Sequence, residues 1–304
     1  MKNYKTLLNE AVNNSIIRKL TDGEIDILQT CTLKIFKKVT QVCDENGLLI
    51  MLGGGSALGS VRHNGFIPWD DDMDLIMPRA DYDKLLVLIE QGILGDDYEF
   101  TYPNKEHDAP SAFLKIYLKG TKLIGLNGED SKYPQGIDLD VFPIEGAPSS
   151  KISRWWRGKI ANTLRLISNV VEESGPWSED AKKLYSRDWK FYIFMRCRQV
   201  IGKMFSVIDH KKWICWYDAF VRMPQIGDFC VIPTGRRLYQ GETLPSKVFF
   251  PVSKGLFEGM EVNLPADTDA YLKNLYGNYM WIPPVEKREC HLIKNMLIDK
   301  NIQH

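Results

Sequence analysis

The chain has 304 residues, and its 39 Lys and Arg balance its 39 Asp and Glu, so the formal net charge is zero. This length suits one or two globular domains with a sizeable core. The neutral balance argues against a nucleic acid as the main partner.

The N-terminal part predicts a helix and a strand that lead into a glycine-rich turn. Apolar residues recur near helical spacing over 24–46, which is typical of an amphipathic helix packed on a sheet. The apolar run 48–52 predicts a buried strand, and a short helix is predicted over 57–63. The Gly-Gly-Gly-Ser run at 53–56 allows a tight turn whose amide groups can bind an anion. Alone, this turn is weak evidence, because no Walker-type Gly-Lys-Ser/Thr follows and a simple tight connection would look the same.

Four aspartates are crowded into five positions ahead of an apolar stretch. They are Asp70, Asp71, Asp72 and Asp74. If 72–77 is a strand, its side chains alternate in direction, so Asp72 and Asp74 point to the same face. Two adjacent carboxylates are suited to hard divalent ions, Mg²⁺ first and Mn²⁺ as the alternative. A solvated acidic turn is the competing interpretation.

The next elements supply a second acidic strand. A helix is predicted over 79–90, followed by strands at 98–102, 113–118 and 123–126, with a hairpin turn at Lys119-Gly120-Thr121 between the last two.

Acidic and apolar residues then alternate over 136–143, which predicts a strand with Asp138 and Asp140 on one face. Either aspartate could complete a metal shell. For Asp138, an edge position that faces water is equally consistent with the pattern.

Residues 150–222 differ in composition from the rest of the chain, and their pattern predicts helices. The stretches 151–167 and 210–217 combine Lys, Arg and Trp. That composition favours an interfacial surface that contacts anionic lipid or a lipid-linked acceptor. The competing interpretation is a helical cap whose tryptophans fill a core, which is the commoner fate of Trp.

The C-terminal part predicts a hairpin or strand pair around 256–262 and a helix over 267–276 that ends at Gly277. The aromatic segment 276–281 would either line a donor pocket or close the hydrophobic core.

The acidic motif and its surroundings resemble one family closely. The resemblance rests on the Gly-Gly-Gly-Ser run, on Gly59-x-x-Arg62-His63-x-Gly65-Phe66-Ile67-Pro68-Trp69-Asp70-Asp71-Asp72-x-Asp74, on Asp140-Val141-Phe142-Pro143, and on Phe257-Glu258-Gly259, Pro265, Tyr271-Leu272, Tyr276-Gly277-Asn278-Tyr279-Met280 and Pro283-Pro284. Together these residues resemble the LicD family of phosphocholine transferases, with the fukutin-related ribitol-phosphate transferases as distant relatives. The resemblance covers roughly residues 45–145 and 245–291.

The resemblance implies a mixed α+β fold with a nucleotidyltransferase-like core, in which helices flank a small mixed sheet, and the composition of 150–222 adds a helical insert. We therefore expect three parts: residues 1–149 as the catalytic core, 150–222 as a basic, Trp-rich helical insert, and 223–304 completing the core.

Within that core, the resemblance implies Asp72, Asp74 and Asp140 as metal ligands. It implies that Gly55 and Ser56 contact the donor phosphates. Gly54 belongs to the same turn. Because Asp138 is a further acid two residues before Asp140, the third ligand could be Asp138 instead of Asp140.

The implied reaction moves a phospho-alcohol, with phosphocholine favoured, from a CDP-linked donor such as CDP-choline to a hydroxyl of a lipopolysaccharide, teichoic acid or other cell-surface glycan precursor, and releases CMP. Asp140 or Asp71 would accept the hydroxyl proton, and Arg62 would contact a phosphate oxygen or make a structural hydrogen bond. A quaternary ammonium headgroup would contact aromatic rings. The candidates are Tyr102, Tyr117, Tyr133, Tyr279 and Trp281.

Two alternatives remain. The same fold could transfer a nucleoside monophosphate from a triphosphate to a small acceptor, or it could bind a nucleotide without catalysis. The mutually repelling carboxylates argue against the second alternative.

The sequence also predicts a cytoplasmic location, with the inner face of the membrane as an alternative. It has no signal peptide and no apolar run of membrane-spanning length. Its cysteines lack Cys-x-x-Cys spacing, which is typical of reduced, mostly buried thiols. They are Cys31, Cys43, Cys197, Cys215, Cys230 and Cys290.

Overall fold

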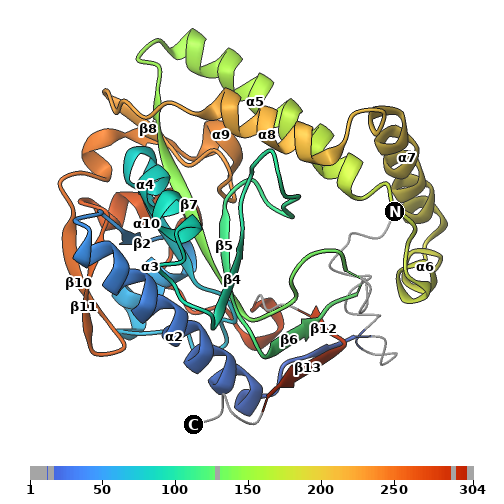
Figure 1. Ribbon diagram of the computed structural model, residues 1–304, viewed down its shortest axis with the longest axis horizontal. Helices are drawn as coiled ribbons and strands as arrows, with labels where there is room; N and C mark the ends of the chain where they lie inside the picture. Colours follow the sequence, from blue (N-terminus) through green and yellow to red (C-terminus); the bar gives the residue numbers. More distant parts are fainter. Residues whose placement is uncertain (1–11, 13–16, 127–130, 289–291, 300–304) are drawn as a thin grey trace.

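The computed structural model describes residues 12, 17–126, 131–288 and 292–299 (Figure 1). Its architecture is mixed α+β, as predicted, with helices around a mixed sheet. The division into three domains at 149 and 222 stays a prediction.

The central sheet takes its strands from distant parts of the chain. They are β2 (Met51–Leu52), β3 (Asp74–Pro78), β4 (Tyr98–Thr101), β5 (Leu114–Leu118), β7 (Asp138–Ala147), β8 (Phe229–Val231) and β9 (Thr243–Pro245). The order is β2-β3-β7-β5-β4, and β8 pairs with β7 and β9. Among these neighbours only β3 and β7 run parallel. The two acidic strands are therefore adjacent and enter the sheet at the same end.

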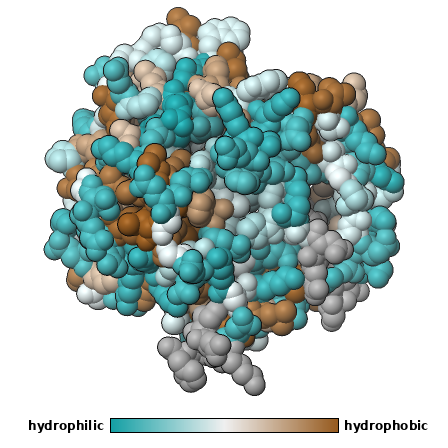
Figure 2. All heavy atoms as spheres, viewed as in Figure 1, coloured by the Kyte–Doolittle hydropathy of each residue, from teal (hydrophilic) through white to brown (hydrophobic). Residues whose placement is uncertain are grey.

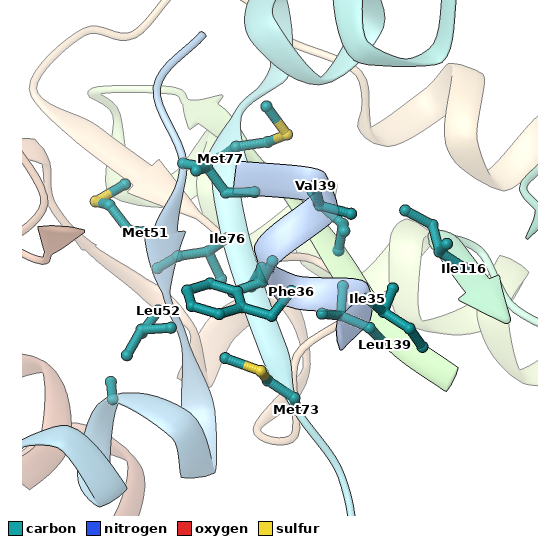
Figure 3. Close-up of a cluster of buried hydrophobic side chains, with 14 of the residues drawn as sticks. Ile35, Phe36, Val39, Met51, Leu52, Met73, Ile76, Met77, Ile116 and Leu139 are labelled. Carbon is teal, nitrogen blue, oxygen red and sulfur yellow. The ribbon is translucent and has the colours of Figure 1, made fainter. Parts of the chain in front are cut away.

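The long helix α2 (Asp22–Glu45) covers the sheet with the apolar stripe that its sequence predicts. Figure 3 shows Phe36 and Val39 among Leu52, Ile76 and Met77 of the strands beneath. All of these side chains are almost fully buried. At about 25 cal/mol per Å² of apolar surface, such a contact stabilises both elements. The predicted helix over 79–90 is also present, as α4 (Arg79–Glu90).

One predicted hairpin is wrong. β6 (Thr121–Ile124) does follow the turn at Gly120, whose φ is +76°. However, β6 pairs with β13 (Asn295–Ile298) and not with β5. The reason is that β4 and β7 already occupy both edges of β5, so β6 has no free ladder to join.

Residues 151–221 form a helical layer on one side of the sheet (Figure 1). Its helices are α5 (Lys151–Glu172), α6 (Glu179–Tyr185), α7 (Trp189–Phe205) and α8 (His210–Val221). Within 210–217, Lys212 and Trp216 are exposed, whereas His210, Trp213, Ile214 and Tyr217 are buried. The membrane contact expected through 210–217 stays a prediction, and these four buried side chains of α8 pack inside the protein.

The C-terminal part returns to the core. The predicted hairpin is β10 (Ser253–Phe257) with β11 (Met260–Leu264), and α10 (Thr268–Tyr276) ends at Gly277 as predicted. The remaining short elements are α9 (Leu238–Gly241), the 3₁₀ turns η1 (Ser246–Val248) and η2 (Val285–Lys287), and β1 (Arg18–Lys19) paired with β12 (Leu292–Ile293).

The cysteine prediction holds in part. Cys31, Cys43 and Cys230 are buried free thiols, whereas Cys197 is exposed. Cys290 lies outside the described residues. Within the part of the chain that the structure describes, no helix has the length and apolar composition needed to cross a bilayer.

Candidate active site

The glycine-rich run is the first turn of a helix and not a turn before it. α3 (Gly54–His63) begins three residues earlier than predicted, with Gly53 as its N-cap. A Cβ on Gly54 would overlap Oδ2 of Asp74, and one on Gly55 would lie 2.8 Å from Oδ2 of Asp70. Two carboxylates therefore lie directly against the helix N-terminus, where the helix dipole and free amides favour negative charge.

The acidic segment is a shaped turn followed by a strand. The amide of Asp70 donates to the carbonyl of Ile67. Nε2 of Gln29 donates to the carbonyls of Ile67 and Asp70, which anchors the turn to α2. β3 begins at Asp74, so Asp72 precedes the strand that was predicted to contain it. The turn, rather than a pleat, brings carboxylate oxygens of Asp70, Asp71 and Asp72 within 4.8 Å of one another.

Ser56 stabilises this arrangement through a hydrogen bond. Its side chain is buried, and its Oγ accepts a hydrogen bond of 2.9 Å from the amide of Asp74. The amide of Gly54 donates to the hydroxyl of Tyr271 at 3.0 Å. These bonds fix the first turn of α3 against β3. Contact of Gly54, Gly55 and Ser56 with donor phosphates stays a prediction.

Asp140 lies beside Asp74, because the two residues are direct partners in the parallel β3–β7 ladder. Lys115 of β5 forms ion pairs with both Asp138 and Asp140, at 2.6 Å from Oδ1 of Asp140. Burial raises the pKa of Asp140 well above its usual range, Lys115 opposes the rise, and Asp138 and Asp74 add to it. Sequence reasoning missed Lys115, whose place opposite Asp140 in the β5–β7 register could not be predicted without the strand pairing.

Arg62 connects α3 to the C-terminal segment. Its Nε donates to Nε2 of His63 at 2.9 Å, and its Nη1 donates to the carbonyl of Tyr279 at 2.9 Å. Burial lowers the pKa of Arg62, while Asp70 raises it. Burial and the adjacent Arg62 lower the pKa of His63. The structural hydrogen bond considered for Arg62 is therefore present.

These elements surround a cavity of about 570 Å³. Asp70, Asp71, Asp72 and Asp74 line it together with Gly54, Gly55 and Arg62. Among the described residues, those that line the cavity include neither Ser56 nor Asp140. Of the five aromatic candidates, Tyr279 and Trp281 line it, and Tyr102, Tyr117 and Tyr133 do not.

Residues 47–127 match the family model described as LicD/FKTN/FKRP, nucleotidyltransferase domain. The lipopolysaccharide cholinephosphotransferase LicD of Haemophilus influenzae is 25% identical over 306 aligned residues, which cover 93% of this chain and 100% of that protein. Both of these findings support the LicD family for this chain. An uncharacterized protein of Rickettsia prowazekii, RP689, is 26% identical over 118 residues, or 37% of this chain and 44% of that protein.

The cavity also has lining residues that sequence reasoning missed. Arg236 and Lys287 line it, with Thr234, Glu242 and Trp69, whereas Tyr276 belongs to the aromatic segment that was predicted to line a donor pocket. The guanidinium of Arg236 lies 5.9 Å from the ring centre of Tyr276, and that of Arg288 lies 4.0 Å from Trp69. A Thr-Gly-Arg-Arg run at 234–237 was visible in the sequence, but nothing local placed it opposite the aspartates.

The donor set fits a hard divalent cation. Asp70, Asp71 and Asp72 each offer a carboxylate oxygen within 4.8 Å of the others, and Asp74 lies on the same wall. Clustered carboxylates are the ligands that Mg²⁺ and Mn²⁺ prefer. The set that the structure draws together is therefore Asp70, Asp71 and Asp72, while Asp74 lines the same cavity and Asp140 pairs with Lys115 outside the lining.

Proposed function

We propose that this protein transfers phosphocholine from CDP-choline to a hydroxyl group of a lipopolysaccharide or similar cell-surface glycan precursor and releases CMP. The alignment with the Haemophilus cholinephosphotransferase over that protein's whole length carries the proposal. The acidic cavity supports it, because its lining combines carboxylates, cationic groups and aromatic rings.

In the proposed complex the acidic wall would hold Mg²⁺, or Mn²⁺ as an alternative, through Asp70, Asp71, Asp72 and Asp74. When bound, the cation would neutralise charge on the donor pyrophosphate. Arg62, Arg236 and Lys287 supply cationic groups on other parts of the lining. The planar guanidinium group of arginine can donate two parallel hydrogen bonds to phosphate oxygens.

The choline headgroup would contact aromatic rings of the C-terminal segment. Trp281, Tyr279 and Tyr276 line the cavity within six residues of one another. A quaternary ammonium against such rings gains about 0.5–2 kcal/mol by cation–π attraction. A CDP-polyol has no cation to use this contact, so we expect CDP-choline to be preferred.

The transfer itself forms one bond and breaks one. The acceptor hydroxyl oxygen attacks the phosphorus that carries choline, and the bond from that phosphorus to the bridging oxygen breaks to release CMP. The hydroxyl proton passes to a carboxylate. We favour Asp71, which lines the cavity, over Asp140, whose Oδ1 already accepts from Lys115.

The test measures CMP release and glycan labelling with CDP-choline, CDP-ribitol or CDP-glycerol, with and without Mg²⁺. We expect CDP-choline to be the best donor and Asp72→Asn to reduce turnover by at least about 10³-fold. Asp96→Asn, an exposed aspartate outside the cavity, is the matched control and should retain activity.

Pyrophosphate release from CTP or ATP, without CMP transfer from any CDP-alcohol, would identify a nucleotidyltransferase instead. Full activity of Asp72→Asn would contradict the site assignment. Thermal unfolding of both variants separates a catalytic loss from a folding loss.

A further inference from the structure

The outward face of α5 is apolar although it lies at the surface. Ile152, Trp155, Trp156, Ile160 and Leu166 are between 45 and 73% exposed. Their spacing places them on one side of the helix, because residues three and four apart share a face. The opposite side packs inward through Gly158, Ala161 and Ser168, which are buried.

A second such face lies on α7. Trp189, Ile193, Val200 and Met204 are 50 to 69% exposed and recur at intervals of four and seven residues. Buried Phe191 and Gly202 hold the inner side. Helices α5 and α7 are in contact, since a Cβ on Gly202 would overlap the carbonyl of Val170. In Figure 2, hydrophobic side chains are visible at the top, over the first turns of α5, and at the upper right, over α7.

The helices that carry these faces are strongly basic. Residues 151–222 contain 15 Lys and Arg against 7 Asp and Glu, a net charge of +8, whereas the remaining 232 residues contain 24 against 32, a net charge of −8. The zero charge of the whole chain therefore conceals a large asymmetry. An anionic partner would be attracted to the helical layer and repelled by the rest.

Cationic groups also flank the apolar stripes. Lys159 follows Trp156 by three residues, and Arg196 and Lys203 lie three or four residues from Val200. Arg196 and Lys203, with Lys182 and Lys183 of α6, line a cleft of about 660 Å³ that also contains Trp177 and Tyr192. Apolar and aromatic side chains bordered by Lys and Arg are the composition of membrane-surface helices.

We propose that the outward faces of α5 and α7 bind the surface of an anionic lipid bilayer. Trp and aliphatic side chains would enter the boundary between headgroups and acyl chains, and the flanking Lys and Arg would contact lipid phosphates. A second copy of this chain fits less well, because each copy would bring the same positive layer. A nucleic acid offers no partner for Ile152, Ile193 or Val200.

The experiment is co-sedimentation of the full chain with phosphatidylcholine vesicles, with or without about 30% phosphatidylglycerol. We expect at least about tenfold stronger binding to the anionic vesicles, because each cation near such a surface contributes to attraction, and weakening of this binding at 0.5 M salt. The double variant Ile193→Ser, Val200→Ser should bind the anionic vesicles at least about fivefold more weakly. The matched control Val87→Ser, Leu256→Ser removes two exposed apolar residues elsewhere and should bind like the original chain.

A charge-reversal pair adds a second readout. Lys159→Glu with Lys203→Glu should abolish the preference for anionic vesicles, whereas Lys37→Glu with Lys247→Glu should leave it within about twofold. Thermal unfolding identifies any variant that fails to fold.

Equal binding to both vesicle types, or equal losses in the face and control variants, would overturn the proposal. So would a dimer that the Ile193→Ser, Val200→Ser variant dissociates, or binding to a DNA duplex without binding to vesicles. Vesicle binding needs no donor or acceptor, so Asp72→Asn should bind vesicles unchanged even if the proposed transfer reaction proves wrong.

Discussion

At the scale of single residues, the site depends on two glycines, because neither has a side chain. Without side chains at Gly54 and Gly55, the carboxylates of Asp74 and Asp70 lie against the start of α3. Gly54 also has a φ of +43°, a region that residues with a Cβ rarely adopt. The same two positions thus accommodate a tight backbone and bring negative charge to the helix N-terminus.

We expect Gly54→Ala to reduce transfer by about 10²-fold or more, because its Cβ would displace Asp74 and a misplacement near 1 Å has that effect. The measurement is steady-state CMP release. Gly47→Ala is the control: Gly47 has a φ of +63°, and a Cβ added there would meet nothing within 4 Å, so the variant adds similar backbone strain without touching the site. Equal loss of activity in both variants would show that strain, and not the position of Asp74, matters.

At the scale of elements, α2 begins with a capping box. Thr21 Oγ1 accepts from the amide of Glu24, and the Glu24 carboxylate accepts from the amide of Thr21 at 2.9 Å. Arg18 adds two bonds of 2.7 Å to the same carboxylate. The hydrogen bond from Arg18 is the main reason that the pKa of Glu24 falls from 4.5 to about 2. This cap holds the helix that covers the sheet and anchors the acidic turn through Gln29.

Because the folded-state pKa of Glu24 is depressed, its stabilisation is complete above about pH 4.5 and is lost as the pH falls toward 2. We expect Glu24→Gln to lower the free energy of unfolding by about 1 kcal/mol at pH 7, since the pair is partly exposed. The difference from the original chain should shrink between pH 4.5 and 2 in urea titrations. Asp26→Asn, exposed on the same helix, should show no such trend; a constant difference for Glu24→Gln would contradict the assignment.

At the scale of the whole molecule, one buried ion network joins the sheet to the helical layer. Arg79 of α4 is 1% exposed and pairs with Glu145 of β7 and with Asp218 of α8, at 2.7 Å from its Oδ1. Glu145 is fully buried, and its Oε2 accepts from the amide of Met223 at 2.7 Å. On its other side the layer reaches the cavity wall, since Arg165 of α5 donates to the carbonyl of Gly235. The helices are thus tied to the site and not merely appended to it.

Arg79→Met should lower the free energy of unfolding by about 3–5 kcal/mol, because it leaves Glu145 buried without its cation. Arg222→Met is the matched control. Arg222 also pairs with Asp218 but is 40% exposed, so its loss should be below about 1 kcal/mol. Chemical denaturation measures both; similar losses would mean that the burial of the network contributes little.

Much of the local structure was predictable, and the reasons are local. The period of apolar residues located α2 and α4, and glycine at 277 located the end of α10. The start of α3 was missed because a glycine run resembles a loop when the carboxylates that require it are not yet in place. Tyr279 and Trp281 were candidates among five aromatics, and only the cavity selected them.

The sequence by itself determined the α+β class, the acidic motif and the family resemblance, because these depend on residue types at short spacing. Only the tertiary structure decided which strand pairs with β6, that Lys115 lies between Asp138 and Asp140, and that Arg236 and Lys287 share a cavity with the aspartates. It also buried four side chains of 210–217 and left the stripe of α7 exposed. The physical reason is that periodicity specifies that a face is apolar, whereas the partner of that face, or its exposure, depends on segments that are distant in the sequence.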